Sequence, residues 1–89
     1  MISDFLEDLP RQIEALTGYL MAGDAAGIEN QAHNIKGVSA NMGGETVRLV
    51  ASDIEKAAKT GSLDSAAALL PELKVQAALL KKALEEMIG

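Results

Sequence analysis

Apolar residues recur at every third or fourth position in four separate segments of this 89-residue chain. Such spacing places them on one face of an α-helix and leaves the opposite face to solvent. Glycines separate the segments, at Gly23, at Gly43 and Gly44, and at Gly61. Glycine most readily adopts the left-handed backbone that ends a helix. The sequence therefore predicts an all-α fold, an antiparallel up-down four-helix bundle with short connections.

The first predicted helix covers about residues 3 to 22, and Ser3 or Asp4 is expected to cap its start. Pro10 lies inside this segment and cannot donate a backbone hydrogen bond to Leu6. It should therefore kink the helix or mark its true first turn. The residues expected to face the core are Phe5, Leu6, Leu9, Ile13, Leu16 and Leu20.

The second predicted helix covers about residues 24 to 42, with Asp24 as its N-cap. At about 100° per residue, the residues that face inward are Ile28, Ala32, Ile35, Ser39 and Met42. His33, Gly37 and Ala40 then face outward, and Lys36 lies at the flank beside them. The two glycines at positions 43 and 44 are expected to supply left-handed backbone where this helix ends.

The third and fourth helices are predicted over about residues 45 to 60 and from residue 62 or 64 onward. The third should bury Val47, Val50, Ala51, Ile54 and Ala58. The fourth should be capped by Ser62 or Asp64 and should bury a seam of Leu63, Ala66, Leu70, Leu73, Ala77, Leu80, Leu84 and Met87. We expect one continuous helix that Pro71 bends locally. The alternative is a separate short turn over residues 63 to 70.

The charge and apolar content exclude several classes of protein. The net charge is −5 and no basic run is present, which argues against nucleic acid as a partner. No apolar run approaches the roughly 20 residues of a membrane span, and the start lacks the features of a signal peptide. We therefore expect a single cytoplasmic domain over residues 1–89, without direct membrane contact. Whether it is free-standing or part of a longer protein stays open.

His33 is the only histidine, and a lone histidine on a helix surface is usually just a solvated polar residue. One histidine without cysteine offers too few ligands for zinc, so we expect no metal site. Its neighbours favour a more specific function. Gly37 occupies an exposed mid-helix position where alanine would stabilise the helix by about 1 kcal/mol more. The small side chain of Ala40 also leaves space on this surface. Lys36 lies one turn away, where its ammonium could stabilise a group added to the nucleophilic imidazole.

Residues 33 to 43 follow the pattern His-x-x-Lys-Gly-x-Ser-x-x-x-Gly, which resembles the signature of histidine phosphotransfer (Hpt) domains. The similarity extends upstream to the Phe-Leu-Glu-Asp-Leu-Pro run at residues 5 to 10 and to Gly23 and Asp24. Downstream it includes a spaced apolar pattern followed by a glutamate, at Val47, Val50, Ala51, Ile54 and Glu55. The resemblance therefore covers nearly the whole chain.

This resemblance implies a phosphoryl carrier without its own ATP-binding site and without a cofactor. His33 would accept a phosphoryl group on its outward nitrogen from the aspartate of a response-regulator receiver domain and pass it to another receiver. Lys36 would neutralise the phosphoryl charge, while Gly37 and Ala40 would let the partner dock closely. The expected partners are a receiver domain and a sensor histidine kinase, and the expected state is a monomer.

Two alternatives to the carrier remain open at this point. One is a helical module that docks receivers without phosphotransfer. The other is the phosphoacceptor domain of a larger histidine kinase, in which an attached ATP-binding domain phosphorylates His33.

Overall fold

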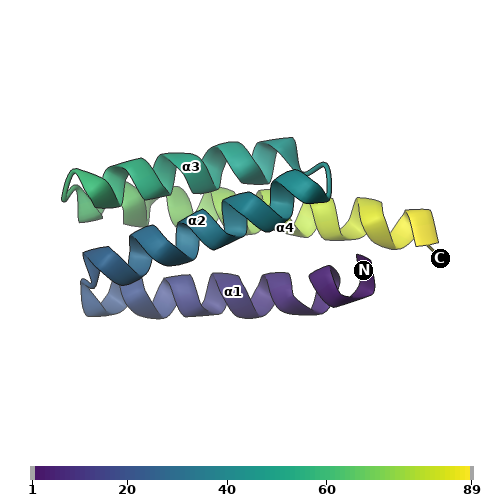
Figure 1. Ribbon diagram of the computed structural model, residues 1–89, viewed down its shortest axis with the longest axis horizontal. Helices are drawn as coiled ribbons and strands as arrows, with labels where there is room; N and C mark the ends of the chain where they lie inside the picture. The colour runs from purple at the N-terminus through teal and green to yellow at the C-terminus, as the bar shows by residue number, and fades with distance from the viewer. Residues whose placement is uncertain (1, 89) are drawn as a thin grey trace.

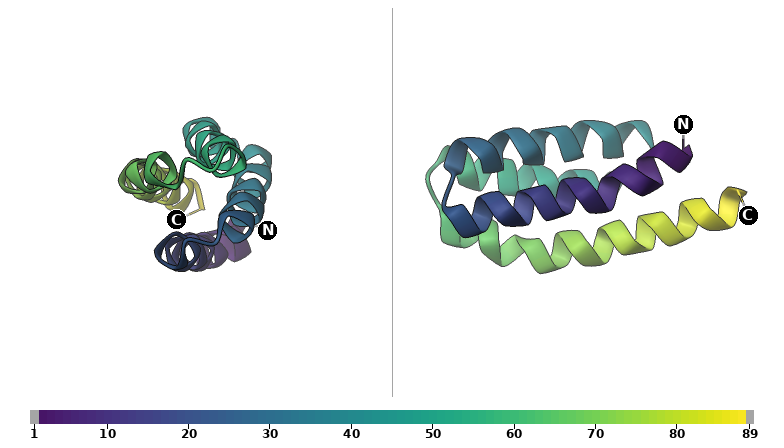
Figure 2. Two further views of the ribbon diagram at one scale, coloured as in Figure 1. Left: turned by 90° about the vertical axis from the view of Figure 1, so that its left-hand side faces the viewer. Right: turned by 90° about the horizontal axis from the view of Figure 1, so that it is seen from below.

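Four helices make up most of residues 2–88, the part of the chain that the computed structural model describes. They are α1 (Ile2–Ala22), α2 (Ala25–Asn41), α3 (Glu45–Lys59) and α4 (Leu63–Ile88). Each helix runs antiparallel to the one before it, in a bundle that measures 41 × 19 × 18 Å (Figure 1). Each packs against its neighbour in sequence, and α4 closes the ring against α1 (Figure 2). The predicted all-α four-helix bundle is confirmed.

The apolar stripes of the four helices meet in one core along the bundle axis. Every helix contributes to it, and its fully buried side chains include Leu16, Ile28, Ile35, Ile54 and Leu73. Burying one such side chain stabilises the fold by about 1.5–3 kcal/mol. These contacts fix the rotation of each helix about its own axis, and that rotation decides which residues remain on the surface. None of the helices within residues 2–88 is long and apolar enough to cross a membrane.

The turns agree with the predicted helix ends except at two places. Asp24 is the N-cap of α2, and its Oδ1 accepts the backbone N–H of Gly27 at 3.0 Å. Gly43 has the expected left-handed φ of 73°, but Gly44 has an ordinary φ of −83°, so the left-handed prediction for Gly44 was wrong. Space is tight at position 44, since a Cβ there would lie 2.5 Å from Cδ2 of Leu80 and 3.2 Å from the carbonyl oxygen of Ser39, so these neighbours would have to shift.

The second difference concerns the start of α1. This helix already includes residues 3 and 4, so neither Ser3 nor Asp4 can be its N-cap, and that prediction was wrong. At the start of α4, by contrast, the carbonyl of Ser62 accepts the backbone N–H of Ala66 at 3.1 Å. Ser62, and not Asp64, therefore occupies the N-cap position of α4.

Both prolines lie inside continuous helices. Pro10 is within α1 and does not mark its first turn, and Pro71 is within α4, so the separate short turn over residues 63 to 70 is excluded. Both prolines are exposed. Each removes the helical hydrogen bond to the carbonyl four residues earlier, that of Leu6 for Pro10 and that of Ala67 for Pro71.

Met87 was predicted to face the core, and this was wrong because its side chain is 74% exposed. The preceding seam residue, Leu84, is buried. With 26 residues, α4 is much longer than the 15-residue α3, and its last turns extend beyond the first turn of α3 (Figure 1).

Candidate functional site

The packing of α2 places His33 on the outside of the bundle. The buried side chains of this helix are Ile28, Ala32, Ile35 and Ser39. The side chain of His33 is 64% exposed, and Gly37 and Ala40 are exposed as well. These positions agree with the angles predicted from the helical repeat.

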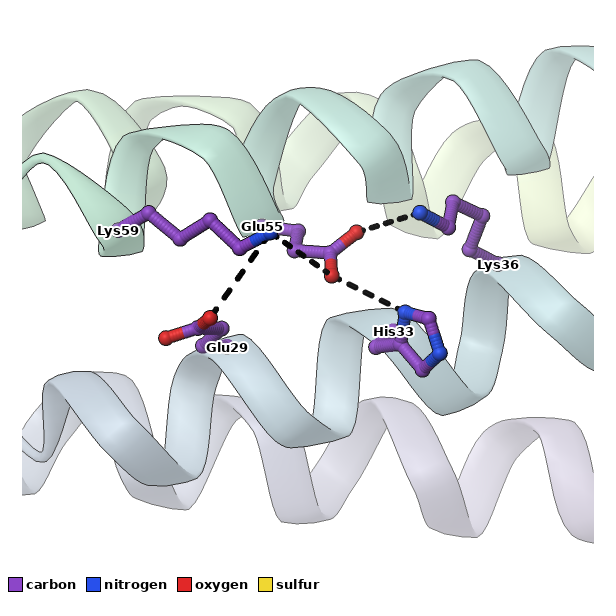
Figure 3. Close-up of polar contacts among 5 residues, drawn as sticks. All are labelled: Glu29, His33, Lys36, Glu55 and Lys59. Atoms are coloured by element: carbon purple, nitrogen blue, oxygen red, sulfur yellow. Dashed lines mark hydrogen bonds and ion pairs between the residues drawn. The ribbon is translucent and has the colours of Figure 1, made fainter.

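A carboxylate from the neighbouring helix α3 holds His33 in place. Nδ1 of His33 lies 3.0 Å from Oε2 of Glu55, and Nζ of Lys36 donates to Oε1 of Glu55 at 2.6 Å (Figure 3). The side chain of Glu55 is only 8% exposed. A buried carboxylate is costly unless it is paired, and the histidine and the lysine together supply that pairing.

The charge state of Glu55 determines which nitrogen of the imidazole can react. Burial raises the pKa of Glu55, but the hydrogen bonds and charges of Lys36 and His33 outweigh burial, so the pKa lies below its usual value of 4.5. Glu55 is therefore ionised at neutral pH and can only accept hydrogen bonds. Nδ1 of His33 must carry the proton, which leaves the lone pair of the neutral ring on Nε2. That nitrogen points away from Glu55 (Figure 3).

The ammonium of Lys36 has a partner that the sequence did not predict. Its Nζ binds the same carboxylate as Nδ1, the inner nitrogen of His33 (Figure 3). The expectation that Lys36 reaches a group on the outer nitrogen stays a prediction. The long lysine side chain finds its strongest available partner in the buried carboxylate, because charge-assisted hydrogen bonds are about twice as strong as neutral ones.

A second lysine lies near the same carboxylate. Nζ of Lys59 is 3.8 Å from Oε2 of Glu55 and 4.0 Å from Oε1 of Glu29 (Figure 3). Glu29 precedes His33 by one turn on α2. The side chains of five residues from two helices therefore form one connected polar group.

The surface on the other side of His33 is an open hollow between α1 and α2. Its lining residues are Gln12, Gln31, His33, Asn34, Gly37, Val38 and Asn41. A Cβ built on Gly37 would have no atom within 4 Å among residues 2–88, apart from its own helix backbone and chain neighbours. The packing of the described chain therefore does not require glycine at this position. Ala40 is exposed on the same helix but does not line the hollow.

Sequence reasoning missed the roles of Glu55 and Lys59. The sequence indicates Glu55 only through the family resemblance, which assigns it no contact, and it does not distinguish Lys59 from other surface lysines. One signal was available for Glu55, because it lies between the inward residues Ile54 and Ala58 of the third helix. A carboxylate on a buried stripe requires a hydrogen-bonding partner. No comparable signal marks Lys59, which is 56% exposed.

Comparisons with known proteins identify the family of the chain. The sequence profile of the Hpt domain matches residues 1–88. The chain is also similar to the phosphorelay intermediate protein rdeA of Dictyostelium discoideum, with 31% identity over 74 residues. That alignment covers 83% of this chain and 29% of rdeA, so the chain spans less than a third of that relative. No solved structure gives a significant match. Hpt domains are helical bundles that carry phosphoryl groups in phosphorelays, and this chain belongs to the Hpt domain family.

Proposed function

We propose that His33 accepts a phosphoryl group on Nε2 from the phosphorylated aspartate of a receiver domain and later passes it to the aspartate of another receiver. The observation that carries this proposal is the contact between Nδ1 of His33 and Glu55. It leaves Nε2 as the nucleophile on a ring that is 64% exposed. Membership of the Hpt family supports a role in phosphotransfer.

In the proposed transfer, the lone pair of Nε2 attacks phosphorus. The bond between phosphorus and the aspartate oxygen breaks, and the aspartate carboxylate leaves with the electron pair. The imidazole becomes positively charged as Nε2 bonds phosphorus while Nδ1 keeps its proton. The carboxylate of Glu55, 3.0 Å from Nδ1, stabilises that positive charge and holds the ring in its reactive orientation.

Lys36 is proposed to offset the negative charge of the phosphoryl group. Its ammonium already lies beside the site, where it hydrogen-bonds Glu55. A cation close to a phosphoryl group acts through attraction to its oxygens, and this attraction is stronger near the low-dielectric protein than in bulk water. In this proposal the lysine both holds Glu55 and contributes positive potential to the phosphorylated site.

Gly37 and Ala40 are proposed to form part of the surface on which the receiver docks. Transfer needs the aspartate oxygen, phosphorus and Nε2 to come into line within close contact. A side chain at position 37 would project into the open space beside His33, where the receiver must approach. Ala40 is exposed two turns beyond His33, and its small side chain leaves space for a partner on the same side of α2.

The remainder of the proposal concerns how the chain works with its partners. We propose that residues 1–89 act as one monomeric domain without an ATP site of its own. A sensor histidine kinase would supply phosphoryl groups to the first receiver. The two rival functions, a docking module without transfer and the phosphoacceptor of a larger kinase, predict different phosphorylation behaviour.

The test is to incubate the chain with a phosphorylated receiver domain. The proposal predicts that phosphate moves to the chain as an acid-labile, alkali-stable phosphohistidine, and that a second receiver removes it. His33→Gln should fold normally, because the side chain is mostly exposed, but should accept no phosphate. Receiver binding without transfer would support the docking module. Labelling only by ATP and a kinase domain would support the kinase phosphoacceptor, and equal labelling of His33→Gln would contradict the proposal.

A further inference from the structure

Two lysines lie on opposite sides of the carboxylate that holds His33 (Figure 3). Lys36 binds Oε1 of Glu55, and Nζ of Lys59 lies 3.8 Å from Oε2, the oxygen that Nδ1 of His33 also contacts. On its other side, Lys59 Nζ lies 4.0 Å from Oε1 of Glu29. Lys59 is thus located between two carboxylates, one of which lies one turn before His33 on the same helix.

The two lysines are held in different ways. Lys36 is 29% exposed and donates a short hydrogen bond to Glu55, which is buried. Lys59 is 56% exposed, and both of its contacts exceed hydrogen-bonding distance. Ion pairs between exposed side chains contribute little to stability. Moving Lys59 away from Glu29 therefore costs little free energy, whereas Lys36 is held by its short hydrogen bond to Glu55.

The charges around His33 balance before phosphorylation and not afterwards. The carboxylates of Glu29 and Glu55 face the ammonium groups of Lys36 and Lys59. A phosphoryl group on a side chain carries a charge of about −1.5 to −2 near pH 7. Of the two cations, Lys59 has the longer and weaker contacts, and its flexible side chain can rotate toward the added charge.

We propose that phosphorylation of His33 draws the ammonium of Lys59 away from Glu29 and toward the phosphoryl oxygens. Glu29 then competes with the phosphoryl group for this cation and so shortens the lifetime of the phosphohistidine. This inference rests on the proposed phosphorylation of His33 and assigns two further residues to that site. Lys59 is the exchangeable cation, and Glu29 is the residue that holds it between transfers.

The competition has a consequence for hydrolysis of the phosphohistidine. Water attacks phosphorus, the bond from phosphorus to Nε2 breaks, and inorganic phosphate leaves while the ring regains its lone pair. The transition state of such transfers is loose, so negative charge shifts from the phosphoryl oxygens toward the leaving nitrogen. A cation on those oxygens therefore stabilises the phosphohistidine more than the transition state. Removing Lys59 should speed hydrolysis, and removing the charge of Glu29 should slow it.

The experiment phosphorylates the full chain with phosphoramidate, which needs no receiver. Its P–N bond breaks, ammonia leaves, and phosphorus bonds Nε2. The ³¹P NMR signal then reports both the hydrolysis rate and, through its shift with pH, the pKa of the phosphoryl group. The variants are Lys59→Met, Glu29→Gln and the two combined. The matched controls are Lys56→Met and Asp53→Asn, which make the same charge changes at exposed positions of α3.

The expected results have opposite signs for the two residues. Lys59→Met should raise the pKa of the phosphoryl group and speed hydrolysis by about three- to fivefold relative to its control. Glu29→Gln should lower that pKa and slow hydrolysis, but should have no such effect when Lys59→Met is also present. That last comparison separates competition for Lys59 from direct repulsion by the carboxylate of Glu29.

Each contrary outcome has a distinct meaning. If Lys59→Met matches Lys56→Met, Lys59 does not bind the phosphoryl group and the inference is wrong. If Glu29→Gln slows hydrolysis equally in the Lys59→Met background, Glu29 acts through its own charge and the competition is disproved. Both of these outcomes leave the proposed carrier function intact. A wild-type chain on which phosphoramidate forms no phosphohistidine at position 33 contradicts the carrier function and this inference together.

Discussion

Nδ1 of His33 and Oε2 of Glu55 lie 3.0 Å apart, although the two residues are separated by 22 positions and belong to different helices. This contact distinguishes His33 from an ordinary solvated histidine. Glu55 is buried and is held on its other oxygen by Lys36, so its carboxylate has a fixed direction. It therefore sets both the orientation of the imidazole and the nitrogen that carries the proton.

Glu55→Gln should place the imidazole proton on the wrong nitrogen. Lys36 needs an acceptor, so the amide oxygen of the variant should face Lys36 and its NH₂ group should face Nδ1. Nδ1 would then accept a hydrogen bond and Nε2 would carry the proton. We expect phosphotransfer to fall by about 10²-fold or more, and ¹⁵N chemical shifts of His33 should show the change of tautomer.

Glu45→Gln is the matched control, because Glu45 lies on the same helix but is exposed and pairs with Arg48. It should leave both the transfer rate and the ¹⁵N shifts of His33 unchanged. Unaltered ¹⁵N shifts in Glu55→Gln would mean that Glu55 does not determine the tautomer.

The stabilising effect of Glu55 should be lost in acid. Its pKa in the folded chain lies below the ordinary 4.5, although burial alone raises it, because the hydrogen bonds from Lys36 and His33 favour the charged form. A lowered pKa means that the stabilisation is complete above about pH 4.5 and disappears as the pH falls through the lower, folded-state pKa. Urea unfolding should show Glu55→Gln to be less stable than wild type by about 1–3 kcal/mol at pH 7. That difference should shrink below pH 4.5, and a difference that stays constant across this range would contradict the assignment.

Gly37→Ala should raise the stability of the fold and slow phosphotransfer. Nothing within residues 2–88 obstructs a Cβ at this exposed helical position, so the substitution should stabilise the fold by about 1 kcal/mol. Gly37→Leu should also fold. If the proposed docking surface is correct, both variants should transfer phosphate more slowly, the leucine variant more so, because their side chains project into the space proposed for the receiver.

Gly18→Ala provides the comparison, since Gly18 is an exposed glycine inside α1 with the same free space around it. It should give a similar gain in stability with no change in transfer. Urea unfolding and transfer from a phosphorylated receiver measure the two properties. Equal transfer rates for the Gly18 and Gly37 variants would remove the docking role of Gly37.

Met87→Lys should hardly change stability, whereas Leu84→Ala should destabilise the bundle by about 2–5 kcal/mol. Both residues belong to the apolar seam of α4, but Leu84 is buried and Met87 is exposed. Exposed substitutions usually change the free energy of unfolding by less than about 0.5 kcal/mol. Thermal or urea unfolding of the two variants gives the comparison. A large loss in Met87→Lys would show that the last turn of α4 packs against something in solution.

Periodicity and the positions of glycine were sufficient to predict the four helices, their order and most of the core. They also predicted that His33, Gly37 and Ala40 lie on the outer side of α2, because buried neighbours such as Ile35 determine the rotation of the helix. These properties depend on residues close together in the sequence, and the helical repeat is enough to derive them. Only the resemblance to Hpt domains assigned phosphoryl chemistry to the histidine.

Contacts between helices could not be derived in this way. The pairing of His33 with Glu55 depends on the register and rotation of α3 against α2, which follow from how the side chains of both helices interlock. The hydrogen bond from Lys36 to Glu55 depends on the same packing. From the sequence alone, the flexible lysine side chain could have pointed toward the side of either nitrogen of His33. Met87 continues the apolar seam of α4 but is exposed, and only the packed structure shows where along α4 that seam stops being covered. The sequence thus determined the helices and the surface on which the histidine lies, whereas the tertiary packing alone decided that a buried carboxylate orients it.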